Sequence, residues 1–188
     1  MTDTTRPKLT TTAVACLIAD GVDFVTRPVA ALTLDFAGIV GDLHAGFTRP
    51  STSREPWYPR GTEIRNDRQL TIVSREELEA VAGAMDLPAI DPAWIGANLV
   101  VAGVADVSAL PSGARLFFDN GATLVVEAEN GPCRTAGRSI ARHFPGRDGL
   151  DLAFPQHAHR KRGVVASVEK PGTIAAGEGF RVDRRDPT

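Results

Sequence analysis

The chain has 188 residues, of which 43% are hydrophobic and 23% are charged, and its formal net charge is −2. A chain of this length and composition can bury the core of one soluble domain without disulfides or a structural metal. The small net charge argues against nucleic acid or a membrane surface as the partner, and no run approaches the ~20 apolar residues of a membrane span.

The first residues, Met1–Lys8, lead into a strand-like run and lack the charged and apolar regions of a secretory signal. We therefore expect a cytoplasmic protein, in which a disulfide between Cys16 and Cys133 is not expected. Cys16 lies in an apolar run, where cysteine usually acts as a small buried hydrophobe. None of the three lysines stands in a setting typical of a Schiff-base lysine, so pyridoxal phosphate is not expected.

Short runs of strand-forming residues, separated by Gly, Pro and Asn turns, dominate the chain. The predicted strands are Ala13–Ile18, Pro28–Asp35, Leu70–Val73, Asn98–Val101, Arg115–Phe118, Thr123–Ala128, Gly163–Val168 and a last one around Gly179–Val182. Asn120 and Gly121 separate two of these runs and predict a type I′ hairpin turn, because both residues accept positive φ. Many strands and few short helices predict a mainly β fold, a closed or partly closed antiparallel β-barrel.

Three helices are predicted between the strands. The first begins at Ser74-Arg-Glu-Glu77, which has capping-box spacing, and should end before Pro88. Asp91, followed by proline, is typical of the N-cap of a second, short helix. The third helix is predicted over residues 132–143, before a Pro-Gly pair.

The stretch from about Asp42 to Asp67 fits no regular element and predicts a long loop rich in proline and arginine. Loops of this length in compact domains are usually functional or disordered. Trp57 and Tyr58 within the loop favour one that packs on another surface or closes over a ligand.

Cys133 is the first candidate functional residue, because it lies where a Gly-Pro turn enters the third predicted helix. The free N–H groups of the helix N-terminus and neighbouring Arg134 favour a thiolate there. Arg134, Arg138 and Arg142 are spaced four apart, so they share one helix face and would add positive charge around the thiol. This setting suits a nucleophile, a persulfide carrier or a soft-metal ligand. The alternative is an inert cysteine beside a solvated basic face.

A second candidate segment is Gly41-Asp42-Leu43-His44-Ala45-Gly46. The bracketing glycines allow a sharp bend that presents an acid and an imidazole on one rim. Asp42 would orient His44, or both would bind a polar ligand. A structural turn held by hydrogen bonds from the backbone to Asp42 is equally consistent with the pattern.

Two arginines, Arg68 and Arg162, stand at the starts of predicted strands. That placement would bring two guanidiniums to the mouth of a barrel, unless both are ordinary surface residues. His157 and His159 have zinc-like spacing but no evident third ligand, so we do not predict a zinc site.

Taken together, these segments resemble the MOSC domain, which is named for the C-terminal part of molybdenum cofactor sulfurase. The matching segments are Gly41–Gly46, Arg49, Asn66–Ser74, Gly96–Leu99, Gly103, Leu110–Gly113, Ala114–Leu116, Pro132-Cys133, Arg162-Gly163, Pro171-Gly172 and Ala176–Glu178. They span about residues 12–183, so a single domain is expected over 1–188. Ala97 replaces the glutamate of the family's G-E-N-L element, which would remove an acidic group from the rim of the pocket.

The resemblance implies a MOSC-type β-barrel with short helices, in which Cys133 either coordinates molybdenum or carries sulfane sulfur. In the first hypothesis, the protein binds molybdenum cofactor and reduces N-hydroxylated small molecules with electrons from a partner protein. Cys133 would ligate the metal, and Asp42 and His44 would shape the pocket as catalytic groups. The residues expected to hold the cofactor are Arg49, Arg68, Asn98, Arg134 and Arg162.

In the second hypothesis, Cys133 accepts sulfane sulfur from a separate cysteine desulfurase and passes it to a metal–sulfur centre. The third is a non-catalytic binding barrel in which Cys133 only packs. The first two hypotheses share the same reactive residue, so the position of the site is the firmer inference.

Overall fold

The computed structural model describes residues 11–184, so the stretch Met1–Lys8, in which a secretory signal was sought, lies outside the described residues. The strands are β1 (Thr12–Ile18), β2 (Arg27–Val29), β3 (Ala31–Asp35), β4 (Gly38–Ile39), β5 (Thr48–Pro50), β6 (Glu63–Arg65), β7 (Leu70–Ser74), β8 (Leu99–Ala102), β9 (Arg115–Phe118), β10 (Thr123–Glu129), β11 (Val164–Lys170), β12 (Gly172–Ala175) and β13 (Phe180–Asp183). The helices are α1 (Arg75–Ala84), α2 (Arg134–Ala141) and α3 (Leu150–His157), with 3₁₀ turns at Pro92–Ile95 and Val107–Ala109. Within residues 11–184, no helix combines the length and the apolar character needed to cross a membrane.

The mainly β prediction is confirmed, but the barrel is not. The largest sheet has the order β13-β9-β10-β11-β7-β8-β1-β2, and the smaller ones are β12-β3-β4 and β5-β6. The parallel pair of β7 and β8 makes the large sheet mixed rather than antiparallel. Where the start of β1 meets the turn before β13, one isolated bridge joins Thr12 to Gly179. Over the described residues this contact is a single bridge and not a ladder, so no sheet closes on itself.

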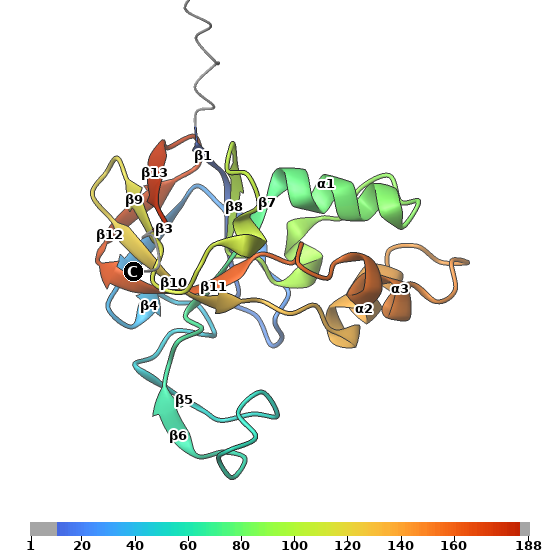
Figure 1. Cartoon of the computed structure of the whole chain (residues 1–188), viewed down its shortest axis with the longest axis horizontal. Coiled ribbons are helices and arrows are strands. Elements are labelled where there is room, and N and C mark those ends of the chain that lie inside the picture. The colour runs from blue at the N-terminus through green and yellow to red at the C-terminus, as the bar shows by residue number, and fades with distance from the viewer. Residues whose placement is uncertain (1–10, 185–188) are drawn as a thin grey trace, which may run out of the picture.

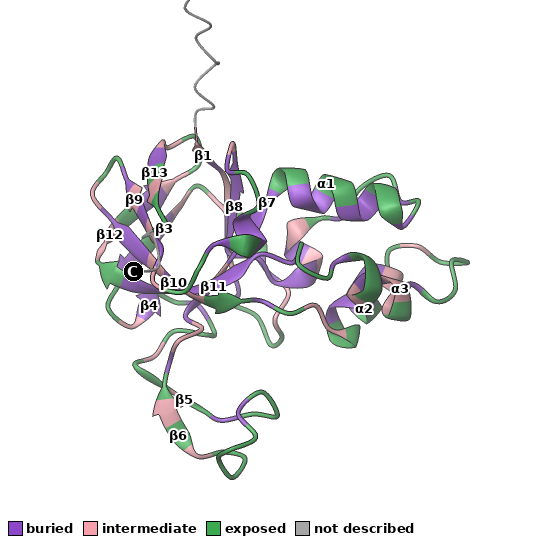
Figure 2. Cartoon of the chain, viewed as in Figure 1, coloured by how far each residue is buried: buried purple, intermediate pink, exposed green. Residues whose placement is uncertain are grey.

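Two apolar clusters lie on opposite faces of the strands β1, β7 and β8. In β7, Leu70 and Ile72 belong to the cluster enclosed by the sheets, whereas Val73 packs into the cluster beneath the helices. The helices lie together at one side of the sheet (Figure 1), and the buried residues concentrate in the strands and on the inner helix faces (Figure 2). Burial on both faces explains why these strands are almost continuously apolar.

Most predicted elements are confirmed within a residue or two. Ser74 is the N-cap of α1 and accepts a hydrogen bond from the N–H of Glu77, and Asp91 caps the 3₁₀ turn after it. The predicted strand Pro28–Asp35 is divided into β2 and β3. Helix α3 was missed, because it follows Gly149, which has positive φ, and contains Pro155, two signals typical of a turn.

The hairpin between β9 and β10 is confirmed, but its turn type differs from the prediction. Gly121 has a φ of 94°, and its N–H donates to the carbonyl of Phe118 at 2.8 Å. Asn120 does not have the positive φ that a type I′ turn requires. The geometry is that of a longer hairpin loop with glycine in the left-handed position.

The segment predicted as a long loop forms an ordered arm that projects from the body (Figure 1). Strands β5 and β6 pair with each other at the base of the arm, with Arg49 opposite Ile64. Trp57 is 70% exposed and has its ring beside that of Tyr58, with centroids 6.3 Å apart. The arm therefore borders the site described below and leaves its aromatic tip open to solvent.

Gly163 allows β11 to start directly beside β7. Its φ is +86°, and an added Cβ would overlap the carbonyl oxygen of Ile72. Gly146 has nearly the same φ, +85°, but open space around its Cα. We expect Gly163→Ala to reduce the free energy of unfolding by about 2–3 kcal/mol more than Gly146→Ala does. Denaturant unfolding of the two variants measures the difference, and equal losses would contradict the steric argument.

Candidate functional site

A cleft of about 660 Å³ brings together residues from several separate parts of the chain. Its wall includes residues of the loop after β4, the base of the arm, the start of β7, the turn before β8, the turn before α2 and the end of the loop before β11. The side chains in this wall that can carry charge or react as a nucleophile are His44, Arg49, Arg54, Arg68, Cys133 and Arg162. Clefts of this size suit a small molecule or a cofactor.

Cys133 is the N-cap of α2, one residue before the helix begins. Its carbonyl oxygen accepts the N–H of Gly137 at 3.2 Å, while its side chain makes no capping hydrogen bond. The residue is half-buried and lies in the wall of the cleft. Its sulfur therefore lies near the positive end of the helix dipole, where a negative charge is favoured.

The other cysteine has a different setting. Cys16 is 1% exposed, and burial raises the pKa of its thiol to about 11. Its Sγ donates to the carbonyl of Ile174 at 3.4 Å. The expectation of a small buried hydrophobe is confirmed.

The basic face of α2 does not point into the cleft. Arg134, Arg138 and Arg142 are all exposed. The guanidinium of Arg134 pairs with the carboxylate of Asp151 at 2.6 Å, and none of the three arginines lines the cleft. The positive charge beside Cys133 therefore comes from other parts of the chain.

Arg162 is the buried cation of the site. It is 7% exposed, its Nη2 donates to the carbonyl of Ile95 at 2.5 Å, and its Nη1 has no hydrogen-bond partner among the described residues. Burial lowers the pKa of Arg162 to about 10, and a negative charge on Cys133 opposes that shift. A buried guanidinium with a free N–H favours an anion beside it.

Arg68 lies in the same cleft and adds a second cationic group. Its Nη2 donates to Oδ1 of Asn130 at 2.9 Å, and the Nδ2 of Asn130 reaches Oγ1 of Thr71 at 3.3 Å. Burial lowers the pKa of Arg68, and the charge of Arg54 lowers it further. Asn130 therefore connects this arginine to the turn that carries Cys133.

Asp42 holds His44 in one orientation. Its buried carboxylate accepts the backbone N–H of His44 at 2.8 Å and the Nδ1 of the imidazole at 3.0 Å. The other carboxylate oxygen accepts the N–H of Ala19 at 2.7 Å and the Nδ2 of Asn98 at 2.9 Å. Burial alone would raise the pKa of Asp42, but the bonds from His44 and Ala19 hold it below its ordinary value.

Asn98 lines the cleft, but its amide is occupied within the protein. Its Nδ2 donates to Asp42, and its Oδ1 accepts the N–H of Thr71 at 2.9 Å. Its neighbour Ala97 is fully buried in the apolar cluster beneath the helices. The position that carries glutamate in the family pattern is therefore not part of the cleft wall in this chain.

Asp42→Asn tests the orienting role of this carboxylate. The NH₂ group of the new asparagine would face at least one of the four N–H donors that Asp42 accepts. We therefore expect the free energy of unfolding to fall by about 3 kcal/mol at neutral pH. Because the folded pKa lies below 3.8, the stabilisation is present above about pH 3.8 and is lost as pH falls through the folded value. The free energy of unfolding of Asp42→Asn should thus vary less with pH in the acid range than that of the wild type. The control Asp23→Asn changes an exposed carboxylate and should cost about 0.5 kcal/mol or less.

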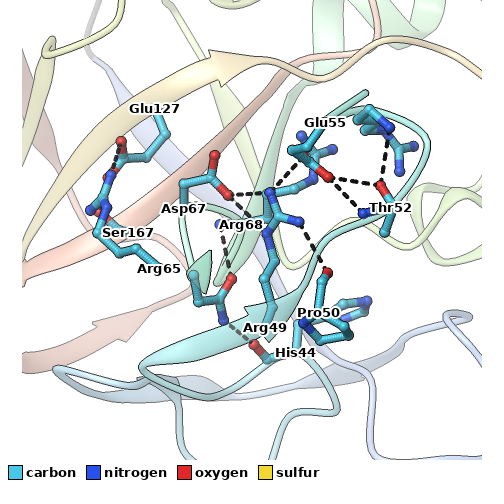
Figure 3. Close-up of polar contacts among 12 residues, drawn as sticks. His44, Arg49, Pro50, Thr52, Glu55, Arg65, Asp67, Arg68, Glu127 and Ser167 are labelled. Carbon is cyan, nitrogen blue, oxygen red and sulfur yellow. Dashed lines mark hydrogen bonds and ion pairs between the residues drawn. The ribbon is translucent and has the colours of Figure 1, made fainter. Parts of the chain in front are cut away.

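Arg49 lines the cleft at the base of the arm, and its guanidinium is already paired. It contacts Asp67 at 2.7 Å and Glu55 at 2.8 Å (Figure 3). Its hydrogen bond is the main reason that the pKa of Glu55 falls to about 2. The predicted role in cofactor binding would therefore have to compete with two carboxylates.

Sequence reasoning did not identify three residues of the cleft wall. Arg54 lies in the arm, where no regular pattern marks it, Thr71 is predicted only as part of a strand, and Asn130 is not predicted as a site residue. Asn130 alone carried a usable signal, since it stands three residues before Cys133 in the same turn.

Comparisons with known proteins show the family of the chain. A family model described as the MOSC domain matches residues 59–181. A Bacillus subtilis (strain 168) relative named "Putative metal-sulfur cluster biosynthesis proteins YuaD" is 43% identical over 175 residues, which cover 93% of this chain and 91% of the relative. The chain therefore belongs to the MOSC family.

Solved structures show the same fold. The crystal structure of the YuaD protein from Bacillus subtilis is similar with a TM-score of 0.92 at 42% identity, covering 94% of this chain and 97% of that one. YiiM from Escherichia coli has a TM-score of 0.59 at 20% identity, with 94% and 72% covered. YiiM from Geobacillus stearothermophilus has a TM-score of 0.60 at 14% identity, with 93% and 76% covered. At these identities the two YiiM structures indicate the fold alone.

Proposed function

We propose that this MOSC protein is a sulfur carrier, in which Cys133 holds a persulfide for delivery to a metal–sulfur centre. The observation that carries the proposal is the half-buried thiol at the N-terminus of α2, in one cleft with the buried Arg162, whose Nη1 has no partner among the described residues. The printed name of the Bacillus subtilis relative, which refers to metal–sulfur cluster biosynthesis, supports the same chemistry.

The charge distribution of the cleft favours an anionic persulfide over a neutral thiol. Arg162 and Arg68 bring positive charge to the wall. The nearby carboxylates do not cancel it, because Asp42 accepts four hydrogen bonds, and Glu55 and Asp67 are paired with Arg49. Among the described residues that line the cleft, a persulfide anion would thus find hydrogen-bond donors and no carboxylate.

His44 has the orientation needed to take a proton. A carboxylate only accepts hydrogen bonds, so the Nδ1 that faces Asp42 carries the hydrogen in the neutral ring. The remaining Nε2 is then an acceptor on a residue that lines the cleft. In the proposed function it receives the proton of the Cys133 thiol before sulfur is accepted.

The proposed sulfur donor is a cysteine desulfurase. Incubation of the protein with a cysteine desulfurase and cysteine, followed by intact mass measurement, should show the added mass of one sulfur atom. Treatment with a reductant should remove it. Unchanged mass under these conditions would reject a cysteine desulfurase as the donor, and a Cys133 that accepts sulfur from no sulfane-sulfur donor would reject the sulfur-carrier proposal.

Molybdenum cofactor is the second candidate, and the residues of the cleft fit it. Cys133 would supply the thiolate for the metal, Arg68 and Arg162 would hold the phosphate of the pterin, and the volume suits a cofactor. When bound, the cofactor would supply the redox chemistry for N-hydroxylated substrates, with electrons from a partner protein. Arg134 lies outside the cleft wall, and the polar atoms of Asn98 are engaged within the protein, so neither supports this candidate.

Metal analysis separates the two candidates. Protein purified from a host that makes the cofactor should contain molybdenum under the second candidate, and Cys133→Ala should lose it. Wild-type protein without molybdenum that still accepts sulfur on Cys133 would support the carrier and reject the cofactor.

A further inference from the structure

We infer that Cys133 takes sulfur directly from a small anionic donor of the thiosulfonate class, for which thiosulfate is the simplest member. The inference rests on the proposed sulfur-carrier function and names a donor that needs no partner protein. Three observations carry it: a buried cation with a free N–H, two further guanidiniums in the same wall, and a thiol on that wall.

The first observation is Arg162. Its side chain is more than nine-tenths buried, and its Nη1 is unpartnered in the described part of the chain. Leaving such a donor unpaired is costly, and a sulfonate oxygen is an acceptor that would satisfy it with a charge-assisted bond. Arg162 and Cys133 line the same cleft, so one small ligand can lie beside both.

The second observation is the gathering of positive charge around Arg162. Arg68 and Arg54 line the same cleft, and both lower the pKa of Arg162. Neighbouring positive charges destabilise one another, and a negative ligand between them would relieve that repulsion. The planar guanidinium suits anions whose oxygens are fixed in space, such as a sulfonate or a sulfate.

The chemistry balances without an added oxidant or reductant. The Cys133 thiolate attacks the outer sulfur of thiosulfate, a new S–S bond forms at Cys133, and the S–S bond of thiosulfate breaks. Sulfite leaves with the electron pair of the broken bond, and the product on the protein is a persulfide. Arginines around the sulfonate would hold the leaving group and stabilise its developing charge.

Thiosulfate alone is the probe for the test. Incubation with thiosulfate should add one sulfur atom to the protein, seen by intact mass, and release sulfite in equal amount. Addition of cyanide should then return Cys133 to its thiol and produce thiocyanate. Inorganic sulfate should slow the loading step, because it occupies the same donors without carrying a transferable sulfur.

Variants test the contribution of the cleft. Arg54→Gln changes an exposed arm residue, so the fold should persist, and we expect loading by thiosulfate to slow about tenfold. Arg162→Lys keeps the positive charge but replaces the planar guanidinium with an ammonium group, and should slow loading further. Arg142→Gln is the matched control, because it removes an exposed charge from α2 outside the cleft. Equal rates in Arg54→Gln, Arg162→Lys and Arg142→Gln would overturn the inference.

A second donor separates failure of this inference from failure of the proposed function. Persulfide formed with a cysteine desulfurase and cysteine, but not with thiosulfate, would reject the small anionic donor and leave the carrier intact. No persulfide from either source would reject both. Persulfide and stoichiometric sulfite from thiosulfate alone, sensitive to Arg54→Gln, would support both.

Discussion

Cys133→Ser should abolish persulfide formation completely, whereas Cys16→Ala should leave it unchanged. Cys133 is half-buried at the cleft, while Cys16 is 1% exposed with a thiol pKa raised to about 11 by burial. Only Cys133 lies in the wall of the cleft, where a sulfur donor can reach its thiol. Intact mass after incubation with a cysteine desulfurase and cysteine measures the result, and iodoacetamide labelling should modify Cys133 alone.

Each substitution serves as the control for the other, because both should keep the fold and only Cys133→Ser removes the thiol of the cleft. Serine is a favourable N-cap, so Cys133→Ser should keep α2 in place, and circular dichroism should match that of the wild type. Cys16→Ala removes one sulfur from the apolar cluster and leaves the cleft untouched. A wild-type Cys133 that resists alkylation and takes no sulfur would instead support the non-catalytic binding barrel.

Arg49→Ala should loosen the internal structure of the arm. The substitution leaves Glu55 and Asp67 without their shared partner (Figure 3). Removing one partner of a partly exposed ion pair costs about 1–2 kcal/mol, so opening of the arm should become about tenfold more frequent. Amide hydrogen exchange at Ser51 and Thr62, whose N–H groups bond within the arm, measures the change.

Arg60→Ala is the control, because Arg60 is an exposed residue of the same arm. It should alter exchange at these amides by little. The ion pair should also survive moderate acid, since the folded pKa of Glu55, about 2, lies below its ordinary 4.5. Its stabilisation is present above about pH 4.5 and is lost as pH falls through about 2. Similar exchange in both variants would show that the arm does not depend on Arg49.

Local patterns in the sequence determined most of the secondary structure. The strands, the Ser74 cap of α1 and the hairpin at Gly121 follow from residue spacing and turn chemistry, which act between near neighbours. The same reasoning predicted a buried Cys16 and a Cys133 at the start of a helix. The ordered set of weak motifs also indicated the MOSC family, which the family model and the relative then showed.

Strand-start positions correctly brought Arg68 and Arg162 to one cleft, but the direction of the basic face of α2 could not be predicted from local patterns. Four-residue spacing correctly placed Arg134, Arg138 and Arg142 on one helix face, but that face is exposed. The charge near the thiol comes instead from Arg162, nearly thirty positions later, and from Arg54 in the arm. Helical periodicity fixes which residues share a face, whereas the packing of α2 on its neighbours decides where the face points.

The sequence by itself determined the local elements, the family and the candidate reactive residue, Cys133. Only the tertiary structure decided that the sheet stays open, that the stretch after Asp42 is an arm, and that Asp42 meets Asn98 and Arg49 meets Asp67. The physical reason is the distance in sequence between the interacting residues. Turns and helix caps depend on neighbouring residues, whereas these contacts join segments far apart in sequence, and their meeting depends on the packing of the whole core.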